Sequence, residues 1–403
     1  FEVINTGMAT INSHVVRLIA EECSKIEPDI VLIYMGNNEV VGPFGAGTVF
    51  GSFSPSLTLI RLGIRLRSYR LGQLAEEILR WVGGTTQFVP EGQGMAMFRD
   101  QYVQSDDDRL QKVYMHFERN LTDIVETLRR DGAEVVVSTV GANLVDHSPF
   151  ASVFGHGLGK ADPQTWGMMF VNGITYAEEG NLVKAIRMLE GANRIDSTHA
   201  ELHYRMGHLY HDQGNQSAAR AHLIRARDFD ALRFRVDSKL NQIIRDTGDR
   251  LKVRSVDTAK LLGDQDRSGL GVPGADLFHE HVHLTFRGNY VVAAGMADEI
   301  FELLGMSDVS VPTIEQCADD LALTPLDRYR LYASVAGLMR RAPFTNQYDY
   351  LEKRKLVNQR VNALRAKGTS RAAIEHSLQT YRQALDRRPG DLALHQNYAQ
   401  MLQ

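Results

Sequence analysis

Short apolar runs alternate along the chain with longer amphipathic segments. Four runs rich in β-branched residues each end at a turn signal and predict strands at residues 1–5, 29–35, 134–140 and 252–256. Between them, in segments such as 13–26 and 110–130, apolar residues recur every three to four positions, which predicts helices. Strands that alternate with helices form a parallel sheet covered on both faces, and ligands bind beyond the carboxyl ends of its strands. The pattern therefore predicts an α/β fold whose chemistry lies at the strand tips.

A long lid-like insertion, residues 45–107, separates the second predicted strand from the helix that follows it. Residues 57–82 combine leucine and isoleucine with five arginines, and we interpret them as a helix that packs over the sheet with its basic face in solvent. The alternative is a basic amphipathic helix that lies on a membrane. Residues 92–97, rich in glycine and methionine, are typical of a lid.

An internal repeat of 34 residues forms a second interruption of the strand and helix pattern. The matching residues are Gly173 and Gly207, Tyr176 and Tyr210, Gly180 and Gly214, Asn181 and Asn215, Ala192 and Ala226, and Asp196 and Asp230. This spacing resembles the tetratricopeptide repeat (TPR), in which small residues let two antiparallel helices approach closely. The resemblance covers residues 163–235, although Ser197 stands where a closing proline is usual. It implies inserted helical hairpins that bind a protein or peptide partner.

Helical periodicity returns after Gly305 and predicts helices at residues 313–323, 325–341 and 348–366. Residues 306–370 are therefore assigned to a helical linker region. Residues 371–403 resemble the start of a further, C-terminal TPR, because small residues and a proline fall at positions of that pattern: Ala384, Pro389 and Ala393. A helical array needs a polar cap, so we expect the chain to continue beyond this half-repeat.

The composition excludes several functions. The chain of 403 residues has 45 Lys and Arg against 49 Asp and Glu, a net charge of −4, which gives no support to nucleic-acid binding. Two cysteines are too few for a disulfide framework or a cysteine zinc site. The sequence indicates no cofactor, and no apolar run has the ~18 residues that a membrane helix needs. Because the chain begins without Met inside a predicted strand, we expect an N-terminal segment before Phe1.

The densest group of ionisable residues follows the fourth predicted strand. In an extended segment, His279, His281 and His283 share one face and could bind zinc or copper. In a helical turn, residues three apart meet, which pairs Glu280 with His283 or, in another frame, Asp276 with His279. A carboxylate that holds one imidazole nitrogen leaves the other to act as a general base. A polar loop that only caps the next helix is the remaining interpretation.

The strand tips supply candidate oxyanion donors. Gly36 and Asn38 directly follow the second predicted strand, where glycine lets the backbone approach a substrate and an asparagine amide can donate to a developing oxyanion. Gly7 and Thr10, at the tip of the first predicted strand, offer further backbone N–H groups.

Three other polar residues have two interpretations each. Asn143 and Asp146 follow the third predicted strand and either line a binding pocket or form loop turns. His14 either caps the start of its own helix or reaches the site. The sequence alone leaves these alternatives open.

Together, the strand tips and the His-rich segment resemble the SGNH hydrolase superfamily, the GDSL-like lipases and esterases. Gly36-Asn37-Asn38-Glu39 is similar to its Gly-x-Asn-Asp block, and residues 280–283 are similar to its Asp-x-x-His block, with Glu in place of Asp. The resemblance implies a flavodoxin-like parallel sheet flanked by helices and formed by residues 1–150 and 245–305. It makes His283 the general base and Glu280 its orienting carboxylate. The implied oxyanion and binding residues are Asn38, Gly36, Gly7 and Thr10, with no metal.

The block that carries the Ser nucleophile of this superfamily does not occur in the chain, so the resemblance implies a nucleophile upstream of Phe1 and an inactive fragment. The implied reaction is hydrolysis of a small acyl ester, or transfer of an acyl group to or from an acylated carbohydrate. Similar bacterial proteins with such an insertion suggest a cell-envelope location and an N-terminal membrane anchor. The alternative is a non-catalytic TPR scaffold that binds proteins and uses a degenerate hydrolase domain as its platform.

Overall fold

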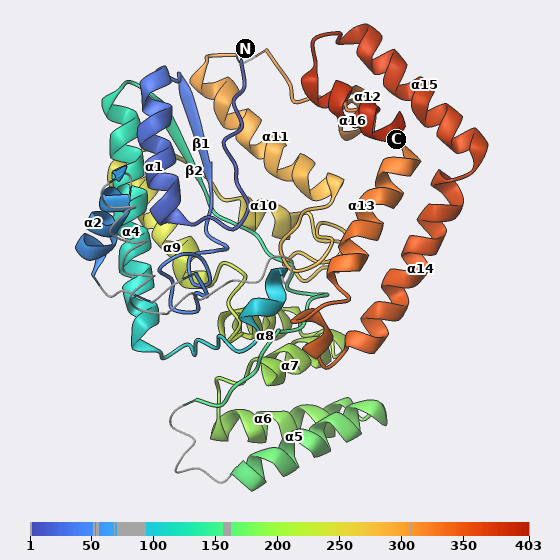
Figure 1. Cartoon of the computed structure of the whole chain (residues 1–403). Coiled ribbons are helices and arrows are strands. Elements are labelled where there is room, and N and C mark those ends of the chain that lie inside the picture. The colour runs from blue at the N-terminus through green and yellow to red at the C-terminus, as the bar shows by residue number, and fades with distance from the viewer. Residues whose placement is uncertain are drawn as a thin grey trace.

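The computed structural model places an α/β body beside two helical hairpins and a C-terminal group of helices (Figure 1). It describes residues 2–50, 53, 56–67, 69–70, 94–155, 163–306 and 308–402. Residues 71–82 of the helix predicted at 57–82, and residues 92–93 of the predicted lid, therefore lie outside the described residues.

Three of the predicted strands form a small parallel sheet. They are β1 (Ile30–Tyr34), β2 (Glu134–Ser138) and β3 (Arg254–Val256), in the order β1-β2-β3. Tyr34 lies opposite Ser138, and Ser138 lies opposite Val256, so the three strands end at one edge. The three valines of the central strand β2 are at most 2% exposed, as expected for a parallel strand covered on both faces.

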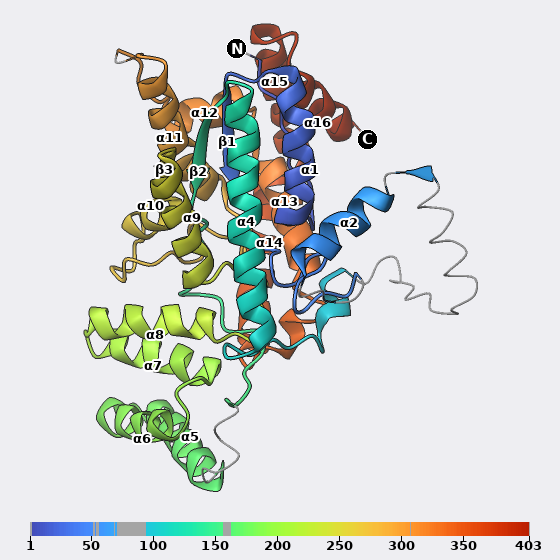
Figure 2. The same ribbon diagram turned by 90° about the vertical axis from the view of Figure 1, so that its left-hand side faces the viewer.

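Helices cover the sheet from two sides (Figure 2). On one side, α1 (Ser13–Cys23), α4 (Asp108–Arg130) and α9 (Ser238–Leu251) build the largest apolar core with the strands. On the other, α10 (Thr258–Asp264) and α11 (Phe286–Leu303) contribute to a smaller cluster. The core face of α4 repeats at helical spacing, with Leu110, Val113, Phe117, Leu121, Ile124 and Leu128 each at most 3% exposed.

The N-terminal residues differ from the prediction. Residues 2–7 form no strand, although the sequence predicts one at residues 1–5, and Val3 and Ile4 are 89% and 58% exposed. A strand needs a neighbour that pairs with its backbone N–H and C=O groups. Among the described residues, β1 pairs with β2 alone, and no strand pairs with the N-terminal segment.

Two helical hairpins lie between β2 and β3 in the sequence. α5 (Pro163–Glu178) and α6 (Leu182–Ile195) form the first, and α7 (Ala200–Asp212) and α8 (Gln216–Asp228) form the second. A Cβ added to Gly173 would lie 2.5 Å from Leu189 Cδ2, and one added to Gly207 would lie 2.8 Å from Leu223 Cδ2. The repeated glycines are therefore needed for the close approach of the two helices in each hairpin.

The turn inside each hairpin is also built twice from the same residues. Gly180 and Gly214 follow the first helix with φ angles of 75° and 85°, a left-handed conformation that favours glycine. The side chain of Asn181 then accepts a hydrogen bond from Lys184 N at 3.2 Å, and that of Asn215 accepts one from Ala218 N at 3.1 Å. These bonds cap the second helix of each hairpin.

An aspartate at the end of each hairpin binds one extended segment, residues 150–155. Asp230 accepts hydrogen bonds from the N–H groups of Phe150 at 3.0 Å and Ala151 at 3.1 Å, and Asp196 accepts one from Gly155 N at 3.1 Å. Asp230 also forms an ion pair with Arg235 at 2.9 Å, in which both side chains are 3% exposed. The repeated aspartates thus fix the hairpins to the chain that leads into them.

The two hairpins have different surroundings. Tyr204 of α7 and Leu223 of α8 share an apolar cluster with Ala142, which follows β2. The first hairpin projects away from the body (Figures 1 and 2). Met168 and Val171 on its helix α5 are 61% and 58% exposed.

The C-terminal region is helical. Its first three helices lie close to those predicted at residues 313–323, 325–341 and 348–366, and they are α12 (Ile314–Asp320), α13 (Pro325–Leu338) and α14 (Tyr350–Gly368). They are followed by α15 (Arg371–Arg387) and α16 (Leu392–Leu402). Leu326 of α13 shares a buried cluster with Tyr381 of α15 and Leu394 of α16. None of the described helices is long and apolar enough to cross a membrane.

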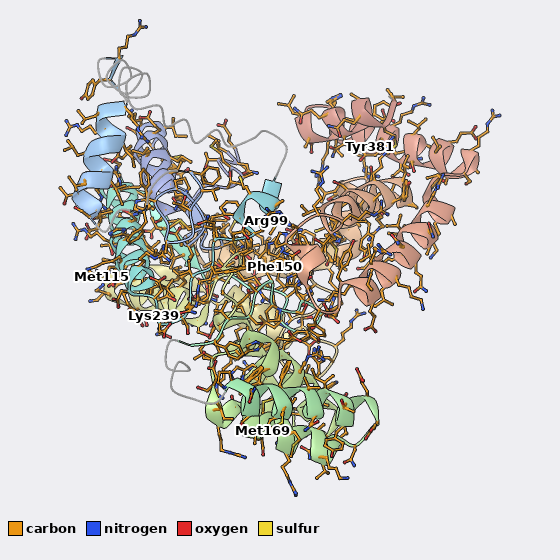
Figure 3. The ribbon with its side chains drawn as sticks, turned by 60° about the horizontal axis from the view of Figure 1, so that its bottom comes forward. Arg99, Met115, Phe150, Met169, Lys239 and Tyr381 are labelled. Atoms are coloured by element: carbon orange, nitrogen blue, oxygen red, sulfur yellow. The ribbon has the colours of Figure 1, made fainter. Side chains whose placement is uncertain are left out.

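An aromatic cluster joins the body, the hairpins and the C-terminal region. Phe150 lies where they meet, while Met169 and Tyr381 mark the outer hairpin and the C-terminal helices (Figure 3). Phe150 packs with Phe234 and with Phe344, which lies in the short helix η4 (Phe344–Asn346). The cluster also buries Phe98 of η2 (Gly94–Phe98), so this short helix of the predicted lid-like insertion is packed against the core.

Candidate functional site

The tip of β1 is held close to the segment after the second hairpin. Gly36 has a φ of 152°, and a Cβ there would lie 2.7 Å from Val236 Cγ2 and 3.9 Å from Val140 Cγ2. The side chain of Asn37 accepts a hydrogen bond from Val236 N at 3.1 Å. Only glycine fits this approach, which places the β1 tip next to the segment that follows β2.

Asn38 and Glu39 connect the same tip to α1. Asn38 Nδ2 donates to the carbonyl of Ile11 at 3.1 Å, which leaves its second N–H hydrogen for another acceptor. Glu39 is buried and accepts from Ser13 N at 2.7 Å and from Ser13 Oγ at 2.8 Å. Burial raises the pKa of Glu39 to about 7. The backbone around Asn38 is thus fixed by a network of hydrogen bonds. Glu39, the acidic residue of this network, is not among the site residues predicted from the sequence.

Gly7 and Thr10 lie in the exposed N-terminal segment. Gly7 N donates to the side chain of Asn5 at 2.9 Å, and Thr10 Oγ1 donates to the carbonyl of Ala9 at 2.7 Å. Thr10 has a φ of 62°, which lies in the left-handed region that favours glycine. Both residues are engaged in local turns, and their oxyanion role stays a prediction.

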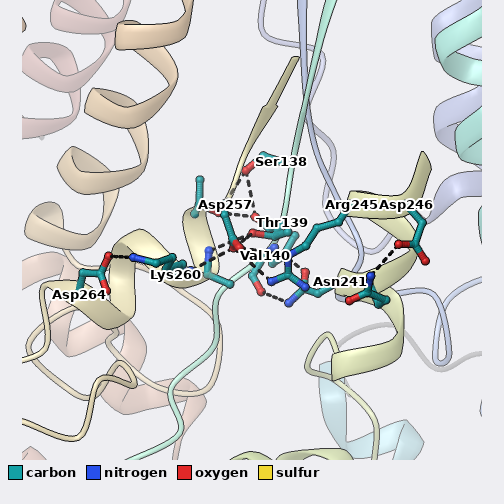
Figure 4. Close-up of polar contacts among 12 residues, drawn as sticks. Ser138, Thr139, Val140, Asn241, Arg245, Asp246, Asp257, Lys260 and Asp264 are labelled. Carbon is teal, nitrogen blue, oxygen red and sulfur yellow. Dashed lines mark hydrogen bonds and ion pairs between the residues drawn. The ribbon is translucent and has the colours of Figure 1, made fainter. Parts of the chain in front are cut away.

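The tip of β2 is fixed by side chains from α9 and from the start of α10 (Figure 4). Asn241 accepts from Val140 N at 2.8 Å and donates to Val140 O at 2.9 Å. Thr139 Oγ1 donates to Asp257 at 2.7 Å, and Asp257 forms an ion pair with Arg245 at 3.0 Å. These bonds hold the edge at which β2 and β3 end.

Asn143 and Asp146 use their side chains within loops. Asn143 Oδ1 accepts from Asp146 N at 2.9 Å, and Asp146 Oδ2 accepts from Ala275 N at 2.6 Å. The backbone of Asn143 donates to the carbonyl of His281 at 3.0 Å. The two residues therefore attach the His-rich loop to the tip of β2, and their side chains form hydrogen bonds within loops. A role of Asn143 and Asp146 in binding stays a prediction.

The His-rich loop is a tight turn between α10 and α11. Phe278 and Leu284 form an antiparallel bridge, and His279 N donates to the carbonyl of His283 at 2.7 Å. Glu280 lies inside this turn and is 2% exposed. Its carboxylate accepts from the backbone N–H groups of His281 at 2.7 Å and His283 at 2.8 Å.

The same carboxylate contacts Nδ1 of the His283 ring. Because Nδ1 faces Glu280, the Nε2 atom is the nitrogen left for a substrate, and the His283 side chain is 65% exposed. Desolvation lowers the pKa of His283 below its ordinary value. A neutral, oriented imidazole with an accessible nitrogen can accept a proton, as a general base does.

The other two histidines lie in different surroundings. His281 is 3% exposed, contacts Glu280 and packs 5.5 Å from the ring of His147. The His279 ring lies 5.7 Å from Tyr332 on α13. Among the described residues, no group of three or more His, Cys, Asp or Glu side chains could hold a metal ion. Asp276 pairs with Arg287 rather than with His279, which leaves Glu280 and His283 as the pair that meets.

His14 is buried beneath the β1 tip rather than capping its helix. Its Nδ1 lies 3.2 Å from Asn120 Nδ2, and the N-cap of α1 is Asn12. Burial lowers the pKa of His14 to about 4, with His116 and Arg61 adding to the effect. His14 therefore belongs to the packing between α1 and α4.

The comparisons with known proteins support one part of the sequence interpretation. A tetratricopeptide repeat model matches residues 176–243, from the end of α5 through α8 into α9. The chain thus carries a TPR, which supports a role in protein interaction, and the interpretation of the 34-residue repeat is confirmed. No curated protein and no solved structure matches the chain.

Proposed function

We propose that this protein binds a partner protein through its outer hairpin, formed by α5 and α6. The TPR match at residues 176–243 carries this proposal. TPR hairpins stack so that each buries an apolar face of its neighbour. α6 packs on α7 in this way, within a cluster that includes Leu189 and Met206. Met168 and Val171 of α5 have no such cover and remain exposed.

The chemistry of α5 favours a partner with an amphipathic helix. Met168 and Val171 are three residues apart, so they lie on one face of the helix, and Thr175 continues this face one turn later. The range Pro163–Glu178 has no Lys or Arg, and its last residue, Glu178, is followed by Glu179. A helix with an apolar stripe and a basic flank would therefore complement it.

A photo-crosslinking amino acid at Val171 of the full chain tests this proposal. The adduct should be with one protein, and mass spectrometry should locate it in a segment with apolar residues three and four apart. A crosslinker at Leu351 of α14, which is 71% exposed, is the control for non-specific capture. The same adducts from both positions, or none from Val171, would contradict the proposal.

Acyl hydrolysis or acyl transfer is the second candidate function. The observation that favours it is the contact of the buried Glu280 with the His283 ring. In this proposal His283 Nε2 takes the proton of a serine as that serine attacks the acyl carbon, and the free N–H hydrogen of Asn38 helps to hold the oxyanion. Glu280 orients the ring and stabilises the imidazolium, as in other serine hydrolases.

The proposal includes a flavodoxin-like sheet with the strand order 2-1-3-4-5. In that order β1, β2 and β3 would be the third, fourth and fifth strands, and residues 1–5 would be the second. The first strand, with the serine, would lie between residues 1–5 and β1. Among the described residues, the N-terminal segment pairs with no strand and β1 pairs only with β2, which supports this arrangement.

A fluorophosphonate, which reacts with activated serines, tests the second candidate. In this proposal the serine does not come from residues 1–403, so a protein that combines such a serine with this chain should be labelled, whereas residues 1–403 alone should not. His283→Ala in that protein should reduce the labelling rate by several orders of magnitude. The matched control is His279→Ala, which should label normally. Equal labelling of both variants would exclude the proposed pair, and labelling of residues 1–403 alone would show that the serine lies within this chain.

A further inference from the structure

We propose that α2 (Leu57–Arg67) is a docking surface for an anionic membrane. Leu59, Leu62 and Leu66 are 62%, 51% and 52% exposed, and Tyr69 just beyond the helix is 55% exposed. The three leucines are spaced by three and four residues, so they form one stripe along the helix. An apolar stripe of this size on a surface marks a site of interaction.

The opposite side of α2 is fixed to the body. Ile60 is 3% exposed, and Arg61 forms an ion pair with Asp123 of α4 at 2.6 Å. Arg61 also donates to Asn120 Oδ1 at 2.8 Å. These contacts hold α2 on α4 with the leucines turned outward. Figure 2 shows α2 at the side of the body beyond α1 and α4, away from the hairpins.

The charge around the leucines favours an anionic surface. Arg65, Arg67 and Arg70 are exposed beside the stripe. A short helix with leucines on one side and arginines around them has the composition of helices that lie in the membrane interface. Its apolar side enters the boundary between headgroups and acyl chains, and guanidinium groups donate to lipid phosphates.

Vesicle flotation with the purified chain tests the proposal. The chain should float with vesicles of phosphatidylcholine mixed with phosphatidylglycerol, and binding should fall in pure phosphatidylcholine and in high salt. Leu59→Ser, Leu62→Ser and Leu66→Ser together should abolish flotation. Arg65→Gln, Arg67→Gln and Arg70→Gln together should weaken binding on the order of a hundredfold, since each arginine near an anionic surface contributes roughly fivefold.

The matched control is the exposed pair Leu351 and Leu356 on α14, which are 71% and 57% exposed. Replacing both by serine should leave flotation unchanged. Thermal melting followed by circular dichroism checks that each variant is folded. If the triple leucine variant is not folded, the single variant Leu62→Ser is tested in its place. The proposal is overturned if the chain does not float, if the control loses as much binding as the leucine variant, or if the leucine variant changes only the oligomeric state.

Discussion

Replacing Asp196 or Asp230 by alanine should give different losses of stability, although the two residues occupy the same position of the repeat. Each accepts backbone hydrogen bonds from residues 150–155, but only Asp230 also neutralises the buried Arg235. Asp230→Ala would leave that guanidinium without its carboxylate, and breaking a buried pair in this way costs about 3–5 kcal/mol. Asp196→Ala removes hydrogen bonds from Gly155 N and from the backbone and hydroxyl of Thr198 but breaks no buried ion pair, so it should cost about 0.5–2 kcal/mol, like the loss of a cap.

Denaturant unfolding followed by circular dichroism measures both losses, and hydrogen exchange at residues 150–155 locates them. The double variant Asp230→Ala with Arg235→Met should regain part of the stability, because no unpaired charge then remains in the core. Equal losses for Asp196→Ala and Asp230→Ala would refute the reasoning. So would a double variant that is less stable than Asp230→Ala alone.

Three other predictions concern packing and pH. Gly207→Ala should lower the unfolding free energy by about 1–3 kcal/mol, measured by thermal unfolding, because the added Cβ would meet Leu223. The control Gly167→Ala, whose Cβ would have no atom within 4 Å, should be neutral or stabilising. Equal effects of the two substitutions would contradict this prediction. The buried His203 and His222 rings lie Nδ1 to Nδ1 at 2.8 Å, and burial lowers both pKa values, that of His222 to about 4. The unfolding free energy should therefore fall as the pH drops from about 6.5 to 4, with a smaller slope in His222→Phe, and an unchanged slope would exclude this source. Burial raises the pKa of Glu39 to about 7, so the unfolding free energy should fall as the pH rises from about 4.5 to 7. Glu39→Gln should remove this part of the pH dependence. A stability difference between Glu39→Gln and the wild type that does not change with pH would count against this prediction.

The sequence predicted those parts of the fold that are set by residues close to one another along the chain. The apolar runs at β1, β2 and β3 are short, β-branched and followed by turn residues, and each forms a strand close to its predicted position. The TPR hairpins could be predicted because each turn and each close helix contact uses the same residue type 34 positions apart. The pairing of Glu280 with His283 also depends on a spacing of three residues, which a tight turn brings together.

The remaining features depend on contacts between distant residues. The apolar residues 1–5 match the strand pattern, but a strand also needs a neighbour to pair with, and periodicity does not supply one. The ion pair of Asp230 with Arg235 and the bonds of Glu39 to Ser13 follow from how the hairpins and α1 meet the body. Similarly, the sequence gives no sign that Asn38 binds the carbonyl of Ile11.

The binding of the crosslinked partner segment to the outer hairpin tests the central claim most directly. A synthetic peptide of that segment is titrated calorimetrically into the full chain and into the variant Met168→Glu with Val171→Glu. The exposed apolar face of α5 predicts at least a tenfold loss of affinity in this variant, because carboxylates would replace its apolar contacts (~1.4 kcal/mol per factor of ten). Leu351→Glu with Leu356→Glu on α14 should bind like the wild type. Unchanged affinity in the α5 variant would show that the outer hairpin is not the partner site.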